Sequence, residues 1–153
     1  MIVAIDNNVL VSLVADRAVF SNLETFLQQC NATLLIPTPV ISEFIAKDHN
    51  KRRMQFMTFE HNKVMFGDFN KKAAFICGEF ASQLPCNQED ADKQKVKVDL
   101  QILSIAIANE AEFLLTEDKD MLRYIKALGI TEIKVLSKSE LKLGLDLFDN
   151  IDD

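Results

Sequence analysis

Short apolar runs alternate with amphipathic stretches along this chain. The opening MIVAIDNNVL begins with a β-branched, apolar run that ends at Asp6, a pattern typical of a buried parallel strand over residues 2–5. Similar runs predict a second strand in ATLLIPTPV, ended by Pro37, and further strands over 113–115 and 133–135. Strands separated by helical stretches predict an α/β fold, with a central parallel sheet of four to five strands flanked by layers of helices.

Apolar residues at helical spacing predict the helices between these strands. The expected helices cover 8–14, 22–29, 39–48, two segments within 51–84, a long segment that opens at Asp99, the stretch after the turn at 116–118, and 138–145. Thr38 is expected to cap the helix that starts at Pro39, and Asn70 to cap a helix after a break at FGDFN. The polar stretch PCNQEDADKQ predicts a loop. We expect one domain over residues 1–147 and an acidic, frayed tail over 148–153.

Composition narrows the class of protein. Of 153 residues, 48% are hydrophobic, which is enough for one filled core. No segment approaches the ~18 uninterrupted apolar residues of a membrane span, and no secretory signal is visible, so we expect a cytoplasmic protein without membrane contact. A net charge of −6 argues against broad electrostatic adhesion to nucleic acid but leaves room for a local basic patch.

Cysteine and histidine are too few and too scattered for most metal sites. Cys30, Cys77 and Cys86 have no CxxC or CxxH spacing, and we expect plain buried or half-buried thiols. The two histidines, His49 and His61, give little support to a zinc enzyme or a Ser-His-Asp hydrolase. Any metal in this protein would therefore need oxygen ligands.

Acidic residues fall where the predicted strands end. Asp6 ends the first strand, Glu43 lies in the helix after the second, Asp99 shares a helical face with apolar residues, and Asp118 follows the strand 113–115. Each alone has a plain explanation as a helix cap, a turn former or a solvated surface residue. Together, carboxylates ~5 Å apart repel by roughly 3 kcal/mol at an effective dielectric of ~20, so protons or cations must compensate them. An all-oxygen pocket suits Mg²⁺ or Mn²⁺.

Three segments together resemble the PIN domain, the metal-dependent ribonuclease fold of VapC-type toxins and several RNA-processing enzymes. IVAIDNNVLVSLV is similar to the opening strand and first acid of that family, and IPTPVISEFIA to the helix that bears its second acid. VDLQILSIAIANEAEFLLTEDKDM resembles the segment with an acid, a small-residue helix, a strand and a Thr-x-Asp turn. The likeness covers nearly the whole chain, although residues 51–84 are less typical of the family.

The resemblance implies a single-stranded RNA nuclease. By this match the acidic positions fall on Asp6, Glu43, Asp99 and Asp118, and the polar supports on Asn8, Thr116 and Asp120. Asp6, Asp99 and Asp118 would hold one or two Mg²⁺ or Mn²⁺ ions, while Glu43 would orient or deprotonate the attacking water. The family also implies a homodimer and, for a toxin, an antitoxin protein as partner.

Basic and aromatic residues provide candidate surfaces for RNA or protein. Two basic stretches, KDHNKRR and KQKVK, supply the expected RNA contacts, which are Lys47, Arg52, Arg53, Lys95 and Lys97. A solvated charged face is the plainer explanation for both stretches. We expect the phenylalanines of the central region to lie in the core or in a subunit interface; these are Phe56, Phe59, Phe66, Phe69, Phe75 and Phe80.

Three other functions stay open. A haloacid-dehalogenase-type phosphatase also begins with a strand that ends in Asp, but it needs a second Asp where this chain has Asn8. A response-regulator receiver also has an acidic Mg²⁺ pocket, but it needs paired acids after the first strand and has no role for Asp99. A PIN-like fold without cleavage activity would act as a binding scaffold for RNA or protein.

Overall fold

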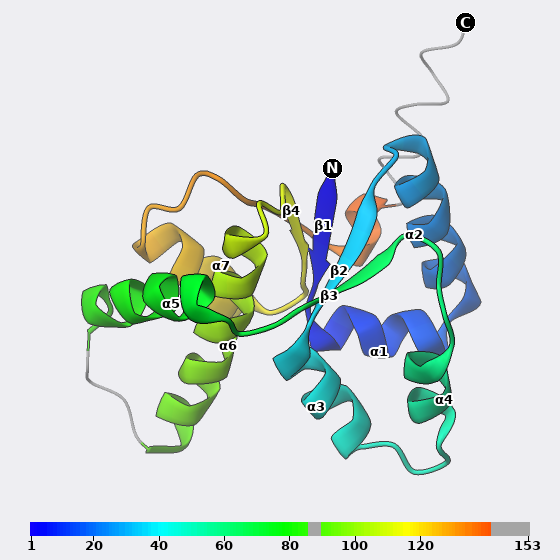
Figure 1. Ribbon diagram of the computed structural model, residues 1–153, viewed down its shortest axis with the longest axis horizontal. Coiled ribbons are helices and arrows are strands. Elements are labelled where there is room, and N and C mark those ends of the chain that lie inside the picture. Colours follow the sequence, from blue (N-terminus) through cyan, green and yellow to red (C-terminus); the bar gives the residue numbers. More distant parts are fainter. Residues whose placement is uncertain (86–89, 142–153) are drawn as a thin grey trace, which may run out of the picture.

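The computed structural model describes residues 1–85 and 90–141, with strands and helices alternating along the chain (Figure 1). The strands are β1 (Ile2–Ile5), β2 (Thr33–Pro37), β3 (Val64–Gly67), β4 (Phe113–Leu115) and β5 (Lys134–Leu136). The helices are α1 (Asn7–Ala15), α2 (Arg17–Gln29), α3 (Thr38–Ala46), α4 (Arg52–Thr58), α5 (Lys71–Gln83), α6 (Asp90–Ala108) and α7 (Lys119–Ala127). Residues 138–141 are also helical. The rest of the helix expected over 138–145, the domain boundary at 147, the tail 148–153 and Cys86 lie outside the described residues.

The strands form one parallel sheet in the order β3-β2-β1-β4-β5. β1 lies at the centre, where Val3 is in register with Leu34 of β2 on one side and with Phe113 of β4 on the other. Val3, Ala4 and Ile5 are fully buried, because helices cover both faces of this strand. The α/β class and the predicted parallel sheet of four to five strands are confirmed.

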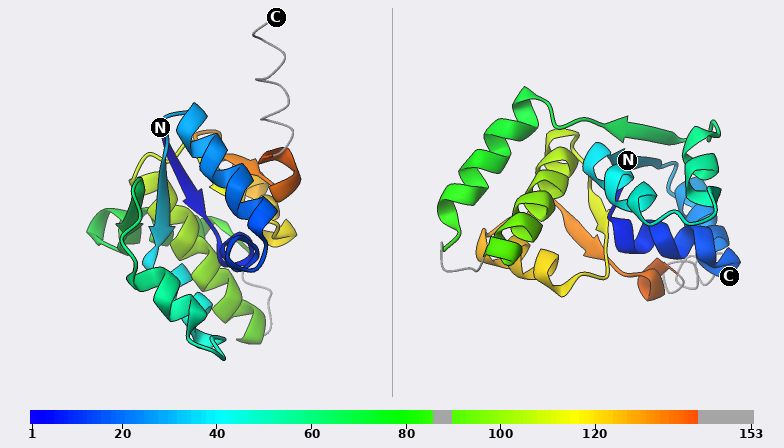
Figure 2. Two further views of the ribbon diagram at one scale, coloured as in Figure 1. Left: turned by 90° about the vertical axis from the view of Figure 1, so that its right-hand side faces the viewer. Right: turned by 90° about the horizontal axis from the view of Figure 1, so that it is seen from below.

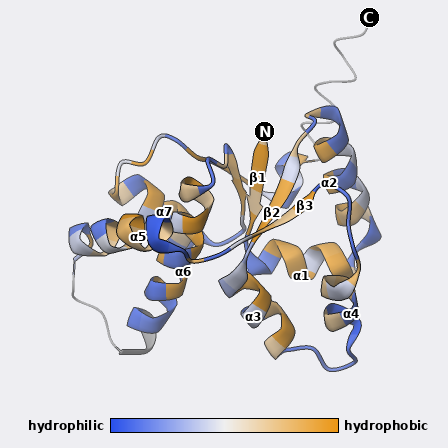
Figure 3. Cartoon of the chain, in the orientation of Figure 1, coloured by the Kyte–Doolittle hydropathy of each residue, from blue (hydrophilic) through white to orange (hydrophobic). Residues whose placement is uncertain are grey.

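Helices form a layer on each side of the sheet. The chain first moves outward from β1 to β3. In Figure 1, α1, α2 and α4 lie to the right of the strands and α3 lies below them. The chain then returns to β4 and continues to β5, so right-handed crossovers place α5 to α7 on the opposite face. The view from below in Figure 2 shows the strands between these two groups. Figure 3 shows hydrophobic residues along β1 and β2 and hydrophilic ones on the outer helix surfaces.

The strand β3 was not predicted from sequence. The region 51–84 was expected to hold only helices with a break at FGDFN, but Val64–Gly67 forms an edge strand that pairs with β2. This strand has only four residues, and its burial is incomplete, so its sequence carries little of the apolar pattern of β1. The expected cap at Asn70 is confirmed, since its side chain accepts a hydrogen bond from the backbone N of Ala73 at 3.0 Å.

Two helix starts also differ from the prediction. α3 begins at Thr38 with Pro37 as its N-cap, and Thr38 makes no capping hydrogen bond. α6 begins at Asp90, so part of the expected loop PCNQEDADKQ is helical and Asp99 lies in the middle of the helix. Residues 90–95 contain no large apolar side chain, which explains why hydrophobic periodicity did not reveal this first part of α6. The helix is instead supported along its length by α5.

Several smaller expectations can also be compared with the structure. β1 and β4 match their predicted bounds, and β5 is shifted by one residue from the expected 133–135. α2 starts earlier than predicted because the carboxylate of Asp16 accepts a hydrogen bond from the backbone N of Ala18 at 2.9 Å. Cys30 and Cys77 are half-buried free thiols, as expected. No described helix combines the length and the apolar character that crossing a bilayer requires.

Gly67 at the end of β3 gives a test of how closely the sheet packs on α6. A Cβ at this position would lie 2.7 Å from Cγ2 of Ile105 and 2.9 Å from Cδ1 of Leu35. We expect Gly67→Ala to lower the free energy of unfolding by about 1–3 kcal/mol in urea denaturation, because the core would be overpacked. The control is Gly78→Ala on the exposed side of α5, where a Cβ meets nothing within 4 Å. That variant should gain up to about 1 kcal/mol from helix propensity, and equal effects of the two substitutions would contradict the packing described here.

Candidate active site

The acidic residues gather where the direction of the chain through the sheet reverses. β1 and β4 are neighbours, but the chain leaves β1 toward β2 and leaves β4 toward β5. In open parallel sheets such a switch point leaves a crevice beyond the carboxyl ends of the two strands. Asp6 directly follows β1, and Thr116 and Asp118 follow β4, so these side chains meet at this crevice.

Asp6 is a buried carboxylate held by two short hydrogen bonds. Its Oδ1 accepts from the backbone N of Asn7 at 2.7 Å, which caps α1, and its Oδ2 accepts from Oγ1 of Thr116 at 2.7 Å. The residue is only 4% exposed. Burial raises the pKa of Asp6, while the hydrogen bonds from Thr116 and Asn7 counteract part of this rise. The side chain is thus fixed in position before any ligand binds.

Asn8 and Thr116 join the loops after β1 and β4. Oδ1 of Asn8 accepts from the backbone N of Glu117 at 3.1 Å, and its Nδ2 lies 3.4 Å from Oγ1 of Thr116 and 3.4 Å from Oδ2 of Asp6. Oγ1 of Thr116 also accepts from the backbone N of Asp118 at 3.0 Å. The side chains expected to support the acids therefore bridge both loops and fix the path of the chain from β4 to Asp118.

Asp99 reaches the same crevice from the middle of α6. It is 6% exposed and shares a helical face with Ile102, Leu103 and Ala106, which are fully buried. Burial is the main reason that the pKa of Asp99 rises to about 6, and the carboxylates of Asp118 and Asp6 add to this rise. The predicted inward orientation of Asp99 is confirmed.

Lys95 places its ammonium among these acids. Its Nζ lies 2.8 Å from Oδ2 of Asp120, 2.9 Å from Oδ2 of Asp118 and 3.4 Å from Oδ2 of Asp99. Burial alone would lower the pKa of Lys95, but the hydrogen bonds to Asp120 and Asp118 outweigh it and raise the pKa. The sequence predicted Lys95 as an RNA contact, whereas in this structure it is the counter-charge of the acidic cluster.

Glu43 approaches the cluster from α3. Burial, followed by the negative charge of Asp6, raises the pKa of Glu43, and the positive charges of Lys95 and Lys47 oppose this rise. The side chain is half-buried and lines a cleft of about 410 Å³ between α3 and α6. The other lining residues are Thr38, Pro39, Ser42, Val98 and Gln101. Glu43 thus lies within electrostatic reach of Asp6, and of the four predicted acids it is the one that lines the cleft.

The donor chemistry of the cluster suits a hard divalent cation. The groups are carboxylates, and two of them, from Asp99 and Asp118, already surround a single cation, the ammonium of Lys95. Within residues 1–85 and 90–141, no three His, Cys, Asp or Glu side chains are spaced as a ready-made metal centre. The oxygens that converge here are instead bonded to Lys95, Thr116 and backbone amides.

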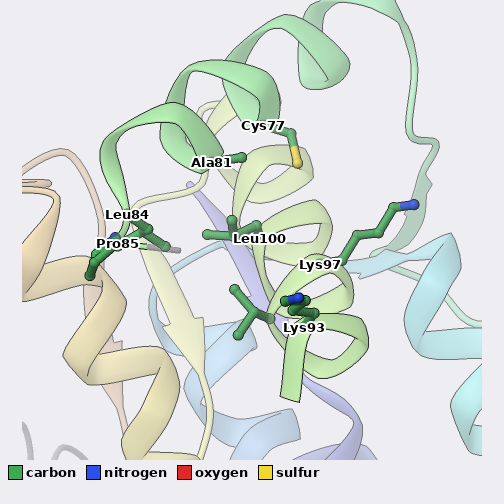
Figure 4. A pocket seen from close by; sticks show the side chains of 8 residues that line it. Cys77, Ala81, Leu84, Pro85, Lys93, Lys97 and Leu100 are labelled. Carbon is green, nitrogen blue, oxygen red and sulfur yellow. The ribbon is translucent and has the colours of Figure 1, made fainter. Parts of the chain in front are cut away.

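The remaining basic residues lie outside the acidic cluster. Arg53 donates from Nη1 to the backbone O of Phe44 at 2.9 Å and stacks on the Phe44 ring at 5.2 Å, so it supports α3 and α4. Lys47, Arg52 and Lys97 are exposed. Lys97 lines a separate, mainly apolar cavity of about 230 Å³ between α5 and α6, as Figure 4 shows. Of these residues, Lys47 is the one whose charge acts on Glu43.

No model of a known protein family matches the sequence, and no curated protein matches it. Solved structures do share the fold. A chain in the crystal structure of VapBC2 from Rickettsia felis, bound to a DNA fragment from its promoter, superposes with a TM-score of 0.64 at 24% identity, over 90% of this chain and 98% of the other. A chain of VapBC-1 from nontypeable Haemophilus influenzae gives a TM-score of 0.59 at 16% identity, over 91% and 99%. The chain therefore has the three-layer, PIN-like fold that the sequence resemblance implied.

Proposed function

We propose that this protein is a metal-dependent endoribonuclease that cleaves phosphodiester bonds of single-stranded RNA. The observation that carries the proposal is the convergence of three carboxylates from distant parts of the chain. Asp6 and Asp118 are linked through Thr116, while Asp118 and Asp99 share the ammonium of Lys95. Such a cluster is tenable at neutral pH only with cationic compensation.

The side chains can be assigned roles in this reaction. Asp6, Asp99 and Asp118 would hold one or two Mg²⁺ or Mn²⁺ ions, directly or through water. Bound there, the metal would acidify a water molecule and neutralise charge on the phosphate and on the leaving oxygen. Glu43, on the wall of the cleft, would orient this water or accept its proton. Asn8, Thr116 and Asp120 would keep the ligands in position.

Charge balance supports an added cation. The negative charge comes from Asp6, Glu43, Asp99, Asp118 and Asp120. Lys95 is the cation that Asp99, Asp118 and Asp120 share, and the exposed Arg123 bonds to Asp120. A pair of carboxylates ~5 Å apart repels by roughly 3 kcal/mol at an effective dielectric of ~20. One ammonium therefore compensates only part of the repulsion. Burial, with a smaller contribution from neighbouring carboxylates, raises the pKa of Asp6, Glu43 and Asp99, which supports the need for a compensating cation when these groups are ionised.

RNA binding requires a local positive surface on a chain of net charge −6. Lys47 follows α3 and acts on Glu43, so it lies within electrostatic reach of the cleft. Arg52, at the start of α4, is also exposed, whereas Arg53 is engaged with Phe44. We therefore favour Lys47, followed by Arg52, as phosphate contacts, with Lys97 on a different side of α6.

The biological role we favour is the toxin of a toxin-antitoxin pair, acting as a homodimer with a small antitoxin protein as partner. Two solved structures with the same fold are VapBC complexes. Large apolar side chains that a partner could cover are present: Phe59 is 68%, Phe66 52% and Phe75 70% exposed. Phe56 and Phe80, in contrast, pack against the core as expected.

A catalytically silent binding scaffold is the second candidate. The observation in its favour is Lys95, whose ammonium already neutralises part of the acidic cluster. A receiver domain is disfavoured, because receivers have the strand order 2-1-3-4-5 whereas this sheet has β3-β2-β1-β4-β5. Cleavage of unstructured RNA by the wild-type protein with Mn²⁺ or Mg²⁺, abolished by EDTA, would select the nuclease over the scaffold.

Asp6→Asn tests the proposed catalytic role. The substitution removes ligand charge at nearly constant volume, and we expect RNA cleavage with Mn²⁺ to fall by more than about 100-fold while the far-UV circular dichroism stays unchanged. The control is Asp16→Asn, since Asp16 caps α2 in the same way that Asp6 caps α1 but lies on the exposed surface. Wild-type cleavage by Asp6→Asn would refute the assignment.

Asp99 should make the metal-free protein less stable as pH rises. The folded protein holds the proton of Asp99 up to a pKa of about 6, whereas the ordinary pKa of an exposed Asp is 3.8. The stabilising contribution is therefore complete below pH 3.8 and is lost as pH rises to about 6. In urea unfolding with EDTA, the stability of Asp99→Asn relative to wild type should increase over this range. Parallel curves for Asp99→Asn and wild type would contradict the raised pKa of Asp99.

Lys47→Gln tests the RNA surface. In an Asp6→Asn background, which prevents cleavage, it should weaken binding of single-stranded RNA and reduce the slope of log K against log salt by about 0.7, as expected for one lost phosphate contact. Lys63→Gln is the control. Lys63 directly precedes β3, so it lies at the amino ends of the strands, whereas the acidic cluster lies at their carboxyl ends. Its Nζ bonds to Oδ1 of Asn31 at 3.1 Å. If both variants keep the wild-type slope, Lys47 does not contact the backbone of the RNA.

A further inference from the structure

Lys95 bonds to the carboxylate oxygens that are still available for a cation. Oδ1 of Asp118 accepts from the backbone N of Asp120 at 2.8 Å, which leaves Oδ2, and this is the atom that Lys95 contacts at 2.9 Å. Both oxygens of Asp6 are already acceptors, from Asn7 and from Thr116. The ammonium of Lys95 and a metal ion bound by Asp99 and Asp118 would thus compete for the same oxygens.

The position of Lys95 in the fold favours this arrangement. It lies one helical turn before Asp99 on α6, so the pair has the i, i+4 spacing at which side chains meet. Asp118 and Asp120 belong to the start of α7, so Lys95 also connects two helices. Arg123 bonds to the other oxygen of Asp120 at 3.0 Å, which leaves Oδ2 of Asp120 to Lys95.

The side chain of Lys95 can also move from the acidic cluster into solvent. Its relative exposure is 47%, compared with 8% for the side chain of Asp99, so the ammonium sits at the solvent side of the cluster. A lysine has a flexible stem of four carbons and a strongly hydrated head group. Movement of this side chain into solvent would free the oxygens of Asp99 and Asp118 without any change in the backbone.

We propose that Lys95 is the resident counter-cation of the acidic cluster, which holds Asp99, Asp118 and Asp120 together in the metal-free protein and is displaced when a divalent metal binds. The inference rests on the proposed function, because it takes Asp99 and Asp118 as metal ligands. It assigns two effects to Lys95. The ammonium lowers the apparent affinity of the site for metal, and it reduces the repulsion among the carboxylates when no metal is bound.

Metal affinity tests the competition. We expect Lys95→Gln to bind Mn²⁺ with a dissociation constant on the order of tenfold lower than that of wild type in isothermal titration calorimetry, because the ammonium no longer competes for the oxygens. Lys97→Gln makes the same charge change on the same helix, at a side chain that faces α5, and should keep the wild-type constant. If Lys95→Gln binds Mn²⁺ with equal or lower affinity than wild type, the competition is refuted.

Stability without metal tests the counter-cation role independently. In EDTA, Lys95→Gln should melt about 2–4 °C below Lys97→Gln, because unpaired carboxylates repel one another. Lys95→Arg, which keeps the charge, should retain most of the wild-type Tm, and addition of Asp118→Asn to Lys95→Gln should recover part of the loss. Equal Tm values for Lys95→Gln and Lys97→Gln would overturn the counter-cation role. Absence of Mn²⁺ binding in every variant would instead refute the proposed function and the competition, while these Tm values would still decide the role of Lys95 in the empty site.

Discussion

The hydrogen bond from Thr116 to Asp6 is the interaction on which the site depends. It joins residues 110 positions apart, at 2.7 Å and in a buried environment, across the boundary between β1 and β4. The backbone N of Asp6 also donates to the O of Leu115 at 2.9 Å, which extends the pairing of the two strands to Asp6. A buried carboxylate without such partners would be costly. Thr116 therefore satisfies Asp6 and, through the backbone N of Asp118, sets the position of the next acid.

Sequence patterns predicted best the strands and helix faces that are fully buried. β1 and β4 could be predicted because their residues are almost all apolar and are followed by polar turns. The face of α6 that carries Asp99 was likewise visible from its spacing to Ile102, Leu103 and Ala106. β3 was not, because its apolar run is short and partly buried and is held as a strand by pairing with β2. The first part of α6 was not, because residues 90–95 include no large apolar side chain. Local patterning reports burial, and these elements are only partly buried.

For the site, the sequence predicted which acids converge but not how they are compensated. Asp6, Glu43, Asp99 and Asp118 could be found because parallel strands bring their carboxyl ends to one edge. The spacing of Lys95 to Asp99 was visible as a helical pair, yet its bonds to Asp118 and Asp120 span 23 and 25 residues and depend on how α6 and α7 pack. Lysines in a polar stretch therefore suggested a solvent-exposed RNA surface, although one of them belongs to the acidic cluster.

The strand order affects how the protein folds during its synthesis. β1 lies between β2 and β4, so one edge of this central strand stays unpaired until residues 113–115 have been synthesised. Contacts of such long sequence separation form late, because the closure of a large loop precedes any gain from pairing. A chain emerging from the ribosome would thus carry Asp6 for 93 residues before Asp99 is added and for 112 residues before Asp118 is added. The cluster of Asp6, Asp99 and Asp118 is therefore a property of the finished molecule, and no shorter amino-terminal part of the chain contains it.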